Sequence, residues 1–238
     1  MKAWLVLLFL LSSKAFGFVL VSDTYRLADP EQTVINIGQG GCQANGLSND
    51  YLKTVIERAI GNYWNSVGES RLQMFVGDEV SRTTSASNAL PGEVLVSCQS
   101  MDSSIAGITF RNQANGSSAI YLNSGSFTAG NYTEEGIVFV LAHELGHAVG
   151  LAHSDDPASI MTYRSHGWTG APKSLSRDDR DGVIYLYPQK SPALDLVGGC
   201  DAVAAPPGAK IRFSIWSFLI ELAMLIALGR LLCSLLRV

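Results

Sequence analysis

The feature that most constrains this chain is the segment of residues 143–153, with the sequence HELGHAVGLAH. His143 and His147 stand four residues apart, so on a helix their imidazoles project from the same face about one turn apart and can bind a single ion. Gly150 lets the backbone leave that helix in a conformation that disfavours other residues, and His153 can then approach as a third ligand. The pattern therefore predicts a helix that ends near Gly150 and carries a metal site.

Three imidazoles leave one position of a tetrahedral ion open, whereas a structural zinc site is closed by four protein ligands. Zinc at an open site lowers the pKa of a bound water from roughly 15.7 toward about 7. Glu144 follows the first ligand and is placed to take the proton of that water and pass it to a leaving amine. The alternative is a set of ordinary helical histidines, yet three of the four histidines in the chain fall within this segment. We therefore predict one catalytic Zn²⁺ bound by His143, His147 and His153, with Glu144 as the general base.

The two ends of the 238-residue chain are more apolar than its middle. Residues 1–17 combine an early lysine, an apolar run and small residues before Gly17, which is the pattern of a secretory signal peptide. The alternative, an N-terminal membrane anchor, is disfavoured because the apolar run is short for a bilayer. We therefore expect an exported protein.

Residues 213–236 form a second apolar stretch, which is long enough to cross a bilayer as a helix. A linker with a Pro-Pro-Gly break, residues 191–212, separates this stretch from the rest of the chain. The arrangement predicts a membrane anchor, in which Glu221 requires a partner or a proton. A second interpretation is a removable sorting tail, because Gly-Gly-Cys at residues 198–200 precedes the stretch and Arg237 follows it. The protein would then be either anchored in the cell envelope or extracellular after processing.

Net charge and cysteine content limit the expected binding partners and the redox compartment. The formal net charge is −4 and the sequence pI is about 5.5, so nucleic acid, which requires a basic surface, is not an expected partner. Of the four cysteines, Cys42 and Cys98 fall within the folded domain. They can form a disulfide in an oxidising compartment or remain buried thiols, and the sequence leaves both alternatives open.

Residues 18–190 are predicted to form one α+β domain. Apolar residues at helical spacing, each set preceded by a capping residue, predict three helices that begin after Ser48, Thr133 and Ser176. Short apolar runs between turn residues predict five strands, at residues 34–37, 72–76, 94–97, 105–110 and 119–123. A helix followed by strands and then by a long central helix indicates one twisted, mostly parallel mixed sheet.

Residues 143–153, followed by Met161 within Ser-Ile-Met-Thr-Tyr, resemble the metzincin signature of three histidines and a methionine turn. The stretch from His153 to Met161 and the later Leu-Ser-Arg-Asp-Asp are similar to the matrixins, in a minimal form of bacterial type. The resemblance implies a metzincin-like zincin fold and a zinc endopeptidase, with Met161 as a hydrophobic base beneath the metal. It also implies that Asp178 and Asp179 tie the last helix to the methionine turn, the alternative being a solvated helix start.

The resemblance bears on the substrate side of the site as well. Tyr163 stands two residues after Met161, as in astacins and serralysins, so it is either a donor to the oxyanion or a packed aromatic of the turn. Residues 164–173 would form the wall of the main specificity pocket, with His166 as a wall residue and not a ligand. A peptide substrate would pair with an edge strand above the zinc, and residues 119–123 are the predicted edge.

The chain also departs from the animal matrixins. His166 is the only histidine left for a second, structural zinc, and the surroundings of Cys42 do not match a cysteine switch, so neither feature is expected. Calcium binding stays open. The sequence predicts an endopeptidase that hydrolyses proteins outside the cytoplasm. The alternative is a non-catalytic zinc-bearing binding or adhesion module of the same fold, against which Glu144 argues.

Overall fold

The computed structural model describes residues 17–125, 133–163 and 172–189. Their strands are β1 (Thr33–Ile37), β2 (Met74–Glu79), β3 (Glu93–Gln99), β4 (Gly107–Asn112) and β5 (Ser117–Asn123). Their helices are α2 (Asn49–Asn62), α4 (Glu134–Val149) and α5 (Arg177–Leu186), with short 3₁₀ turns at Gln43–Asn45 and Trp64–Ser66. The strand order is β2-β1-β3-β5-β4, and all neighbouring strands are parallel except β4, which runs antiparallel to β5. The predicted α+β fold with a mostly parallel mixed sheet is therefore confirmed.

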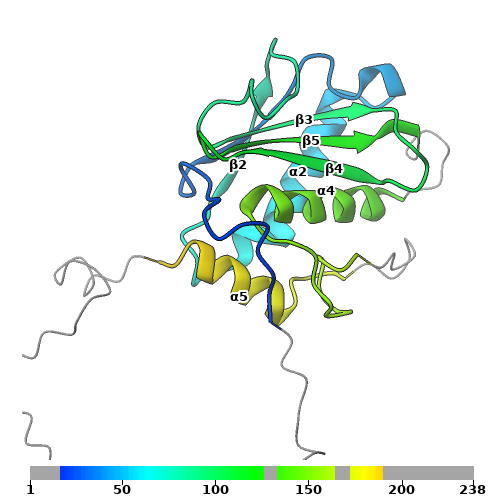
Figure 1. Cartoon of the computed structure of the whole chain (residues 1–238). Coiled ribbons are helices and arrows are strands. Elements are labelled where there is room, and N and C mark those ends of the chain that lie inside the picture. Colours follow the sequence, from blue (N-terminus) through cyan, green and yellow to red (C-terminus); the bar gives the residue numbers. More distant parts are fainter. Residues whose placement is uncertain (1–16, 126–132, 164–171, 190–238) are drawn as a thin grey trace, which may run out of the picture. The chain divides into compact units, whose positions relative to one another are not determined.

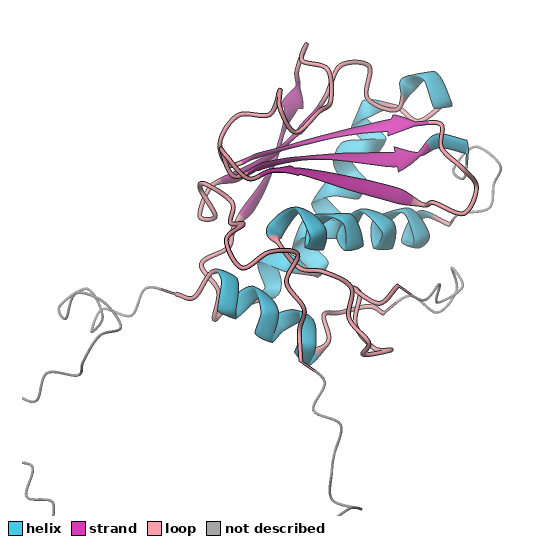
Figure 2. Ribbon diagram, viewed as in Figure 1, coloured by secondary structure: helices cyan, strands magenta, loops and turns pink. Residues whose placement is uncertain are grey.

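Helices α2 and α4 cover one face of the sheet, and α5 lies on the side of α4 that faces away from the strands (Figure 1). Figure 2 shows the strands as one twisted layer above these helices. Ile35 and Ile120 from the sheet are fully buried with Ile56 of α2 and Leu141 and Leu145 of α4. Burial of each such side chain stabilises the fold by about 1.5–3 kcal/mol, so α4 is held firmly between the sheet and α5.

Side chains that accept from backbone N–H groups fix the starts of the three helices. The hydroxyls of Ser48, Thr133 and Ser176 accept from the backbone of Tyr51, Gly136 and Asp179 respectively. At α5 the carboxylate of Asp179 also accepts from the backbone of Ser176, which completes a capping box. The three predicted capping residues are thus confirmed.

A disulfide joins Cys42, in the turn after β1, to Cys98 near the end of β3. The Cα atoms are 4.7 Å apart, and the bridge closes a loop across a sequence separation of 56 residues. Restricting the unfolded chain in this way contributes roughly 4 kcal/mol in the chain-entropy model. Of the two alternatives that the sequence left open, the structure has the disulfide and not the free thiols.

The prediction that residues 119–123 form the edge strand is wrong. They belong to β5, which pairs with β3 on one side and with β4 on the other. The edge beside α4 is β4, which overlaps the strand predicted at residues 105–110. Ala119 and Ile120 are fully buried because both faces of β5 are covered, as expected for a central strand.

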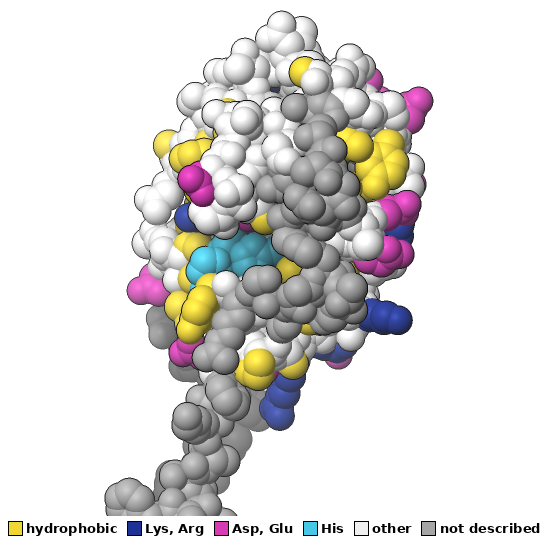
Figure 3. Space-filling model, turned by 90° about the vertical axis from the view of Figure 1, so that its right-hand side faces the viewer, with side chains coloured by type: hydrophobic (Ala, Val, Ile, Leu, Met, Phe, Trp, Pro, Cys, Tyr) yellow, Lys and Arg dark blue, Asp and Glu magenta, His cyan; other side chains and the backbone are white. Residues whose placement is uncertain are grey.

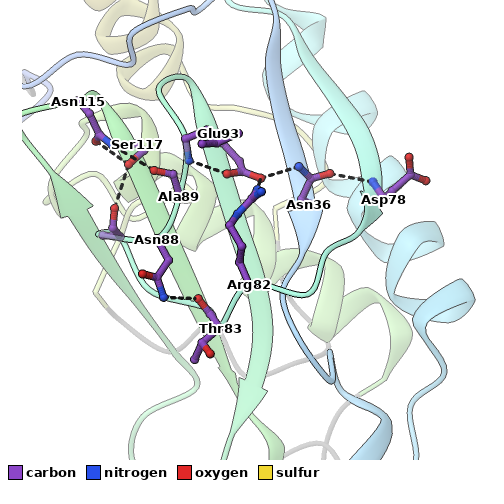
Figure 4. A network of polar contacts seen from close by, with 11 residues as sticks. Asn36, Asp78, Arg82, Thr83, Asn88, Ala89, Glu93, Asn115 and Ser117 are labelled. Carbon is purple, nitrogen blue, oxygen red and sulfur yellow. Dashed lines mark hydrogen bonds and ion pairs between the residues drawn. The ribbon is translucent and has the colours of Figure 1, made fainter.

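The segment between β2 and β3 covers the opposite face of the sheet, where Ala89 packs on Leu95 and Ala119. Glu93 anchors this cover, with a side chain only 4% exposed. Its carboxylate accepts from Asn36, from Arg82 and from the backbone of Leu90, and Figure 4 shows the Asn36 and Arg82 side chains pointing toward it. The charge of Glu93 is thus buried with a cationic partner and further hydrogen bonds, as a buried carboxylate requires.

Within the described residues, none of the helices combines the length and the apolar character needed to cross a bilayer. The predicted signal peptide, residues 1–17, lies outside the described residues except for Gly17. The predicted linker and the predicted C-terminal helix, residues 191–212 and 213–236, lie entirely outside them.

Candidate metal centre and active site

Helix α4 carries His143 and His147 on one face, and it ends at Gly150 with a φ of 113°. A side chain is strained at that φ, so glycine is the residue that allows the chain to reverse here. The chain then returns through Leu151 and brings His153 beside the two helical rings. The three ring centroids lie 4.8 to 5.3 Å from one another.

Backbone carbonyls orient the two helical imidazoles. His143 donates through Nδ1 to the carbonyl of Ile160 at 2.6 Å, and His147 donates through Nδ1 to the carbonyl of Leu151 at 2.8 Å. A carbonyl only accepts, so each ring carries its proton on Nδ1 and presents a bare Nε2 to the cavity. Hydrogen bonds of this kind to the second nitrogen are what orients histidine ligands of metal ions.

The donor set fits zinc. The Nε2 atoms of His147 and His153 are 3.2 Å apart, and the candidate ligand atoms of all three histidines lie within 4.8 Å of one another. Two Zn–N bonds of about 2.0–2.1 Å at a tetrahedral angle place their nitrogens about 3.3 Å apart. Burial lowers the pKa of His143 to about 4 and that of His147 to about 3. Both rings are therefore neutral at pH 7, which is the form that binds a metal.

Glu144 projects from α4 beside the histidines and is only 5% exposed. Burial raises the pKa of its carboxyl to about 7, while a hydrogen bond from Thr109 and the positive charge of Arg111 act in the opposite direction. The Thr109 hydroxyl lies 2.6 Å from Glu144 Oε2. A carboxyl with a pKa near neutrality suits a group that both accepts and returns a proton.

Met161 lies directly beneath α4 and is 1% exposed. A Cβ at Gly146 would be 2.2 Å from the sulfur of Met161 and 2.9 Å from the ring of Trp64, so this helical position has room only for hydrogen. Trp64 in turn donates through its indole N–H to the carbonyl of Ala142 at 3.0 Å. The methionine turn and Trp64 thus form a close-packed floor under the two helical histidines.

The two acidic residues at the start of α5 reach toward that turn. Asp178, 7% exposed, accepts from the hydroxyl of Ser154, next to His153. Asp179, 1% exposed, accepts from the hydroxyl of Ser159 and from the backbone N–H of Ile160 at 3.0 Å. Neither side chain is solvated, so the alternative of a solvated helix start does not hold for this structure.

Sequence reasoning missed the side chains that satisfy the last carbonyls of α4. Arg111 of β4 donates to the carbonyl of His147 at 3.2 Å, and Tyr187 donates to that of Val149 at 2.6 Å. The Tyr25 hydroxyl lies 3.0 Å from the carbonyl of Ala148. Carbonyls at a helix end lack partners within the helix, so these contacts stabilise the segment that carries the ligands. The alternation of β4, which turns Thr109 and Arg111 to the same face, was the available signal.

A cavity of about 680 Å³ opens over this site, and Figure 3 shows histidine side chains reaching the surface on that face of the molecule. Its lining includes the three histidines and Glu144, and it extends to Phe139 of α4, to Val21 near the N-terminus and to the residues before β4, Ser103, Ser104 and Ile105.

Tyr163 also lines this cavity. It is 60% exposed, with its ring centroid 6.3 Å from that of His153. Its ring is thus largely exposed, and its role as a donor to the oxyanion stays a prediction. The predicted wall of the specificity pocket, residues 164–173 with His166, falls largely in residues 164–171, outside the described residues.

The arrangement of two histidines on one helix, a glycine turn to a third histidine and a methionine turn beneath them is similar to that of the metzincins. Comparison with known proteins narrows this class, because residues 96–188 match the family model described as Matrixin. Over these residues the chain is therefore similar to the matrixins, a branch of the metzincins.

The chain is 46% identical over 66 residues to matrix metalloproteinase-25 of Homo sapiens, an alignment that covers 26% of this chain and 12% of that protein. It is 41% identical over 63 residues to the interstitial collagenase of Sus scrofa, covering 26% of this chain and 13% of that protein. It is 37% identical over 65 residues to the matrilysin of Rattus norvegicus, covering 27% and 24% respectively. The chain thus spans at most about a quarter of the length of these relatives.

Proposed function

We propose that this protein is a zinc-dependent endopeptidase that hydrolyses peptide bonds of proteins outside the cytoplasm. The observation that carries the proposal is the convergence of three Nε2 atoms in an open cavity, with the buried carboxyl of Glu144 beside them. His143, His147 and His153 would hold the zinc, which would supply the Lewis acidity that activates water and polarises the scissile carbonyl. The remaining chemistry belongs to side chains of the chain itself.

Glu144 acts as the general base in this proposal. Its carboxylate takes the proton of the attacking water and then delivers it to the nitrogen of the leaving amine. Without a bound metal, burial raises the pKa of this carboxyl to about 7, which makes it a stronger base than an exposed glutamate. Tyr163, at the mouth of the cavity beside His153, is placed to donate its phenol proton to the oxyanion that develops from the substrate carbonyl.

An extended peptide would bind by adding a strand to the sheet at β4. This strand is an edge, its inner face contacts Glu144, and residues of it line the cavity. Pairing with the backbone of β4 aligns a substrate without regard to its sequence, whereas the cavity walls select side chains. Phe139 is the large apolar side chain of α4 that faces this cavity.

We also propose export through a signal peptide at residues 1–17 and an envelope or extracellular location. The Cys42–Cys98 disulfide supports this location, because such bonds persist in oxidising compartments. The apolar stretch at residues 213–236 would anchor the mature protein, or it would be removed with processing near Cys200. Mass spectrometry of the mature C-terminus separates these outcomes, since an intact Val238 excludes removal.

The test of the enzymatic proposal is cleavage of a mixed protein substrate by the purified, zinc-loaded protein and by Glu144→Ala. We expect cleavage by the wild type to disappear in the variant and in the presence of a chelator, with the thermal unfolding transition retained. Glu135→Ala is the matched control, because this residue lies on the same helix and its side chain is 71% exposed. Equal cleavage by wild type and Glu144→Ala would remove Glu144 from the mechanism, and a protein that binds zinc without cleaving would support the binding module.

A further inference from the structure

The edge strand β4 turns alternate residues toward α4, and these residues meet the catalytic segment. Gly107, Thr109 and Arg111 share this face. A Cβ at Gly107 would lie 2.8 Å from Cγ of Glu144 and 3.0 Å from Oε1, so a side chain there would displace the Glu144 side chain. Arg111 donates to the carbonyl of His147, two residues short of the end of α4. The strand therefore contacts the helix at Glu144 and at His147.

The Thr109 hydroxyl lies between two oxygens of the same residue. It is 2.6 Å from the carboxylate atom Oε2 of Glu144 and 3.0 Å from the backbone carbonyl of Glu144. A hydroxyl has one proton to donate, and a charged acceptor at the shorter distance makes the stronger hydrogen bond. Thr109 thus holds the carboxylate at a defined place relative to the backbone of its own helix.

The two carboxylate oxygens consequently have different surroundings. Oε2 accepts the hydroxyl of Thr109, and Oε1 lies toward the backbone of Gly107, which also lines the cavity. A general base accepts its proton through one oxygen, which must stand within hydrogen-bond distance of the attacking water. Holding one oxygen on the protein directs the other toward that water.

On the basis of the proposed function, we propose that Thr109 is a positioning residue for the general base: its hydroxyl holds Oε2 of Glu144 so that Oε1 faces the reacting water. The Thr109 hydroxyl does not touch the substrate in this arrangement. Its β-branched side chain on a strand has few rotamers, so the hydroxyl is itself well placed before the substrate binds. A residue with this role affects turnover and leaves substrate binding and zinc binding intact.

The experiment compares the zinc-loaded full-length protein with Thr109→Val, which is nearly isosteric but lacks the hydroxyl, and with Thr109→Ser, which retains it. The measured quantities are kcat and KM on a peptide substrate that the wild type cleaves, and zinc affinity by competition with a chelator. We expect kcat of Thr109→Val to fall by about 10- to 100-fold, the range for groups that orient a functional residue. We expect KM and zinc affinity to stay within about threefold, and Thr109→Ser to retain most of kcat.

A crystal structure of Thr109→Val provides a readout that does not depend on activity. We expect the Glu144 carboxylate to leave the position it has in the wild type while the histidines stay in place. A fall in kcat of less than fivefold, a loss confined to KM, or a parallel loss of zinc affinity would each overturn the positioning role. If the wild-type protein cleaves no substrate, the proposed function is refuted. The positioning role of Thr109 is tested independently of cleavage, because an unchanged position of the Glu144 carboxylate in Thr109→Val would refute it.

Discussion

Replacement of Asp179 by asparagine tests whether the start of α5 holds the metal centre together. The carboxylate accepts from the backbone of Ile160 at 3.0 Å, from the backbone of Ser176 at 2.9 Å and from the hydroxyl of Ser159. Asparagine keeps one acceptor oxygen and places an NH₂ group where the other stood. One buried donor then loses its acceptor, at a cost of about 1–3 kcal/mol, and the remaining contacts lose the assistance of a charge. We therefore expect Asp179→Asn to lower the free energy of unfolding by about 2–5 kcal/mol.

The same substitution should weaken zinc binding through the backbone. The backbone N–H of Ile160 donates to Asp179, and the backbone carbonyl of the same residue accepts from Nδ1 of His143. If this turn shifts, the His143 ring loses the hydrogen bond that orients it. Loss of a hydrogen bond to the second nitrogen of a histidine ligand typically lowers metal affinity by about 10- to 100-fold. Asp181→Asn is the matched control, since its side chain is 51% exposed and forms an ion pair with Arg177 in the same helix. That exposed pair contributes at most about 0.5 kcal/mol.

Urea denaturation in the presence of a chelator measures the free energy of unfolding without the contribution of bound metal, and chelator competition measures zinc affinity. If Asp179→Asn unfolds with the same free energy as Asp181→Asn and binds zinc equally well, the link from α5 through Ile160 to His143 has no energetic role. The reasoning would also be refuted if stability fell and zinc affinity did not.

Two further predictions follow from packing and from titration. Gly146→Ala should lower the free energy of unfolding by about 1–3 kcal/mol, because its Cβ would lie 2.2 Å from the sulfur of Met161. The control is Gly61→Ala in α2, whose Cβ meets nothing within 4 Å and which should be neutral or stabilising by up to about 1 kcal/mol. Equal urea midpoints of the two variants would show that Met161 does not pack under the site. In metal-free protein, burial lowers the pKa of His143 from 6.5 to about 4 and that of His147 from 6.5 to about 3. As the pH falls below 6.5, the two imidazoles therefore bind protons in the unfolded state before they do so in the folded state. The free energy of unfolding that is present above pH 6.5 is lost in consequence. Glu144, whose pKa is raised from 4.5 to about 7, binds its proton in the folded state and offsets one of the two. From these three groups we expect the free energy of unfolding to fall by about 1.4 kcal/mol per pH unit near pH 5.5, and about twice as steeply in Glu144→Gln. Urea midpoints that stay level from pH 7 to 5 in both proteins would contradict the burial of the two imidazole rings.

Much of the site could be predicted from the sequence because the features that form it are local. The four-residue spacing of His143 and His147 determines that both rings leave one helix face, and Gly150 marks where that helix ends. Ser48, Thr133 and Ser176 are capping residues whose effect reaches only one turn along the chain. Each of these signals depends on residues within a few positions of one another, so no knowledge of tertiary structure is needed.

Contacts between distant residues required the tertiary structure. The order of strands in a sheet depends on which surfaces each strand buries, and a short apolar run does not reveal its neighbours. The sequence therefore predicted an edge at β5, whereas β4 is the edge strand. The contact between Thr109 and Glu144 joins residues 35 positions apart, and the disulfide joins residues 56 positions apart. The sequence by itself determined which residues are proposed to bind zinc and to act as the base. The packing of β4 and α5 against α4 decided how those residues are oriented, because only close packing in three dimensions places a hydroxyl or a carboxylate within hydrogen-bond distance of them.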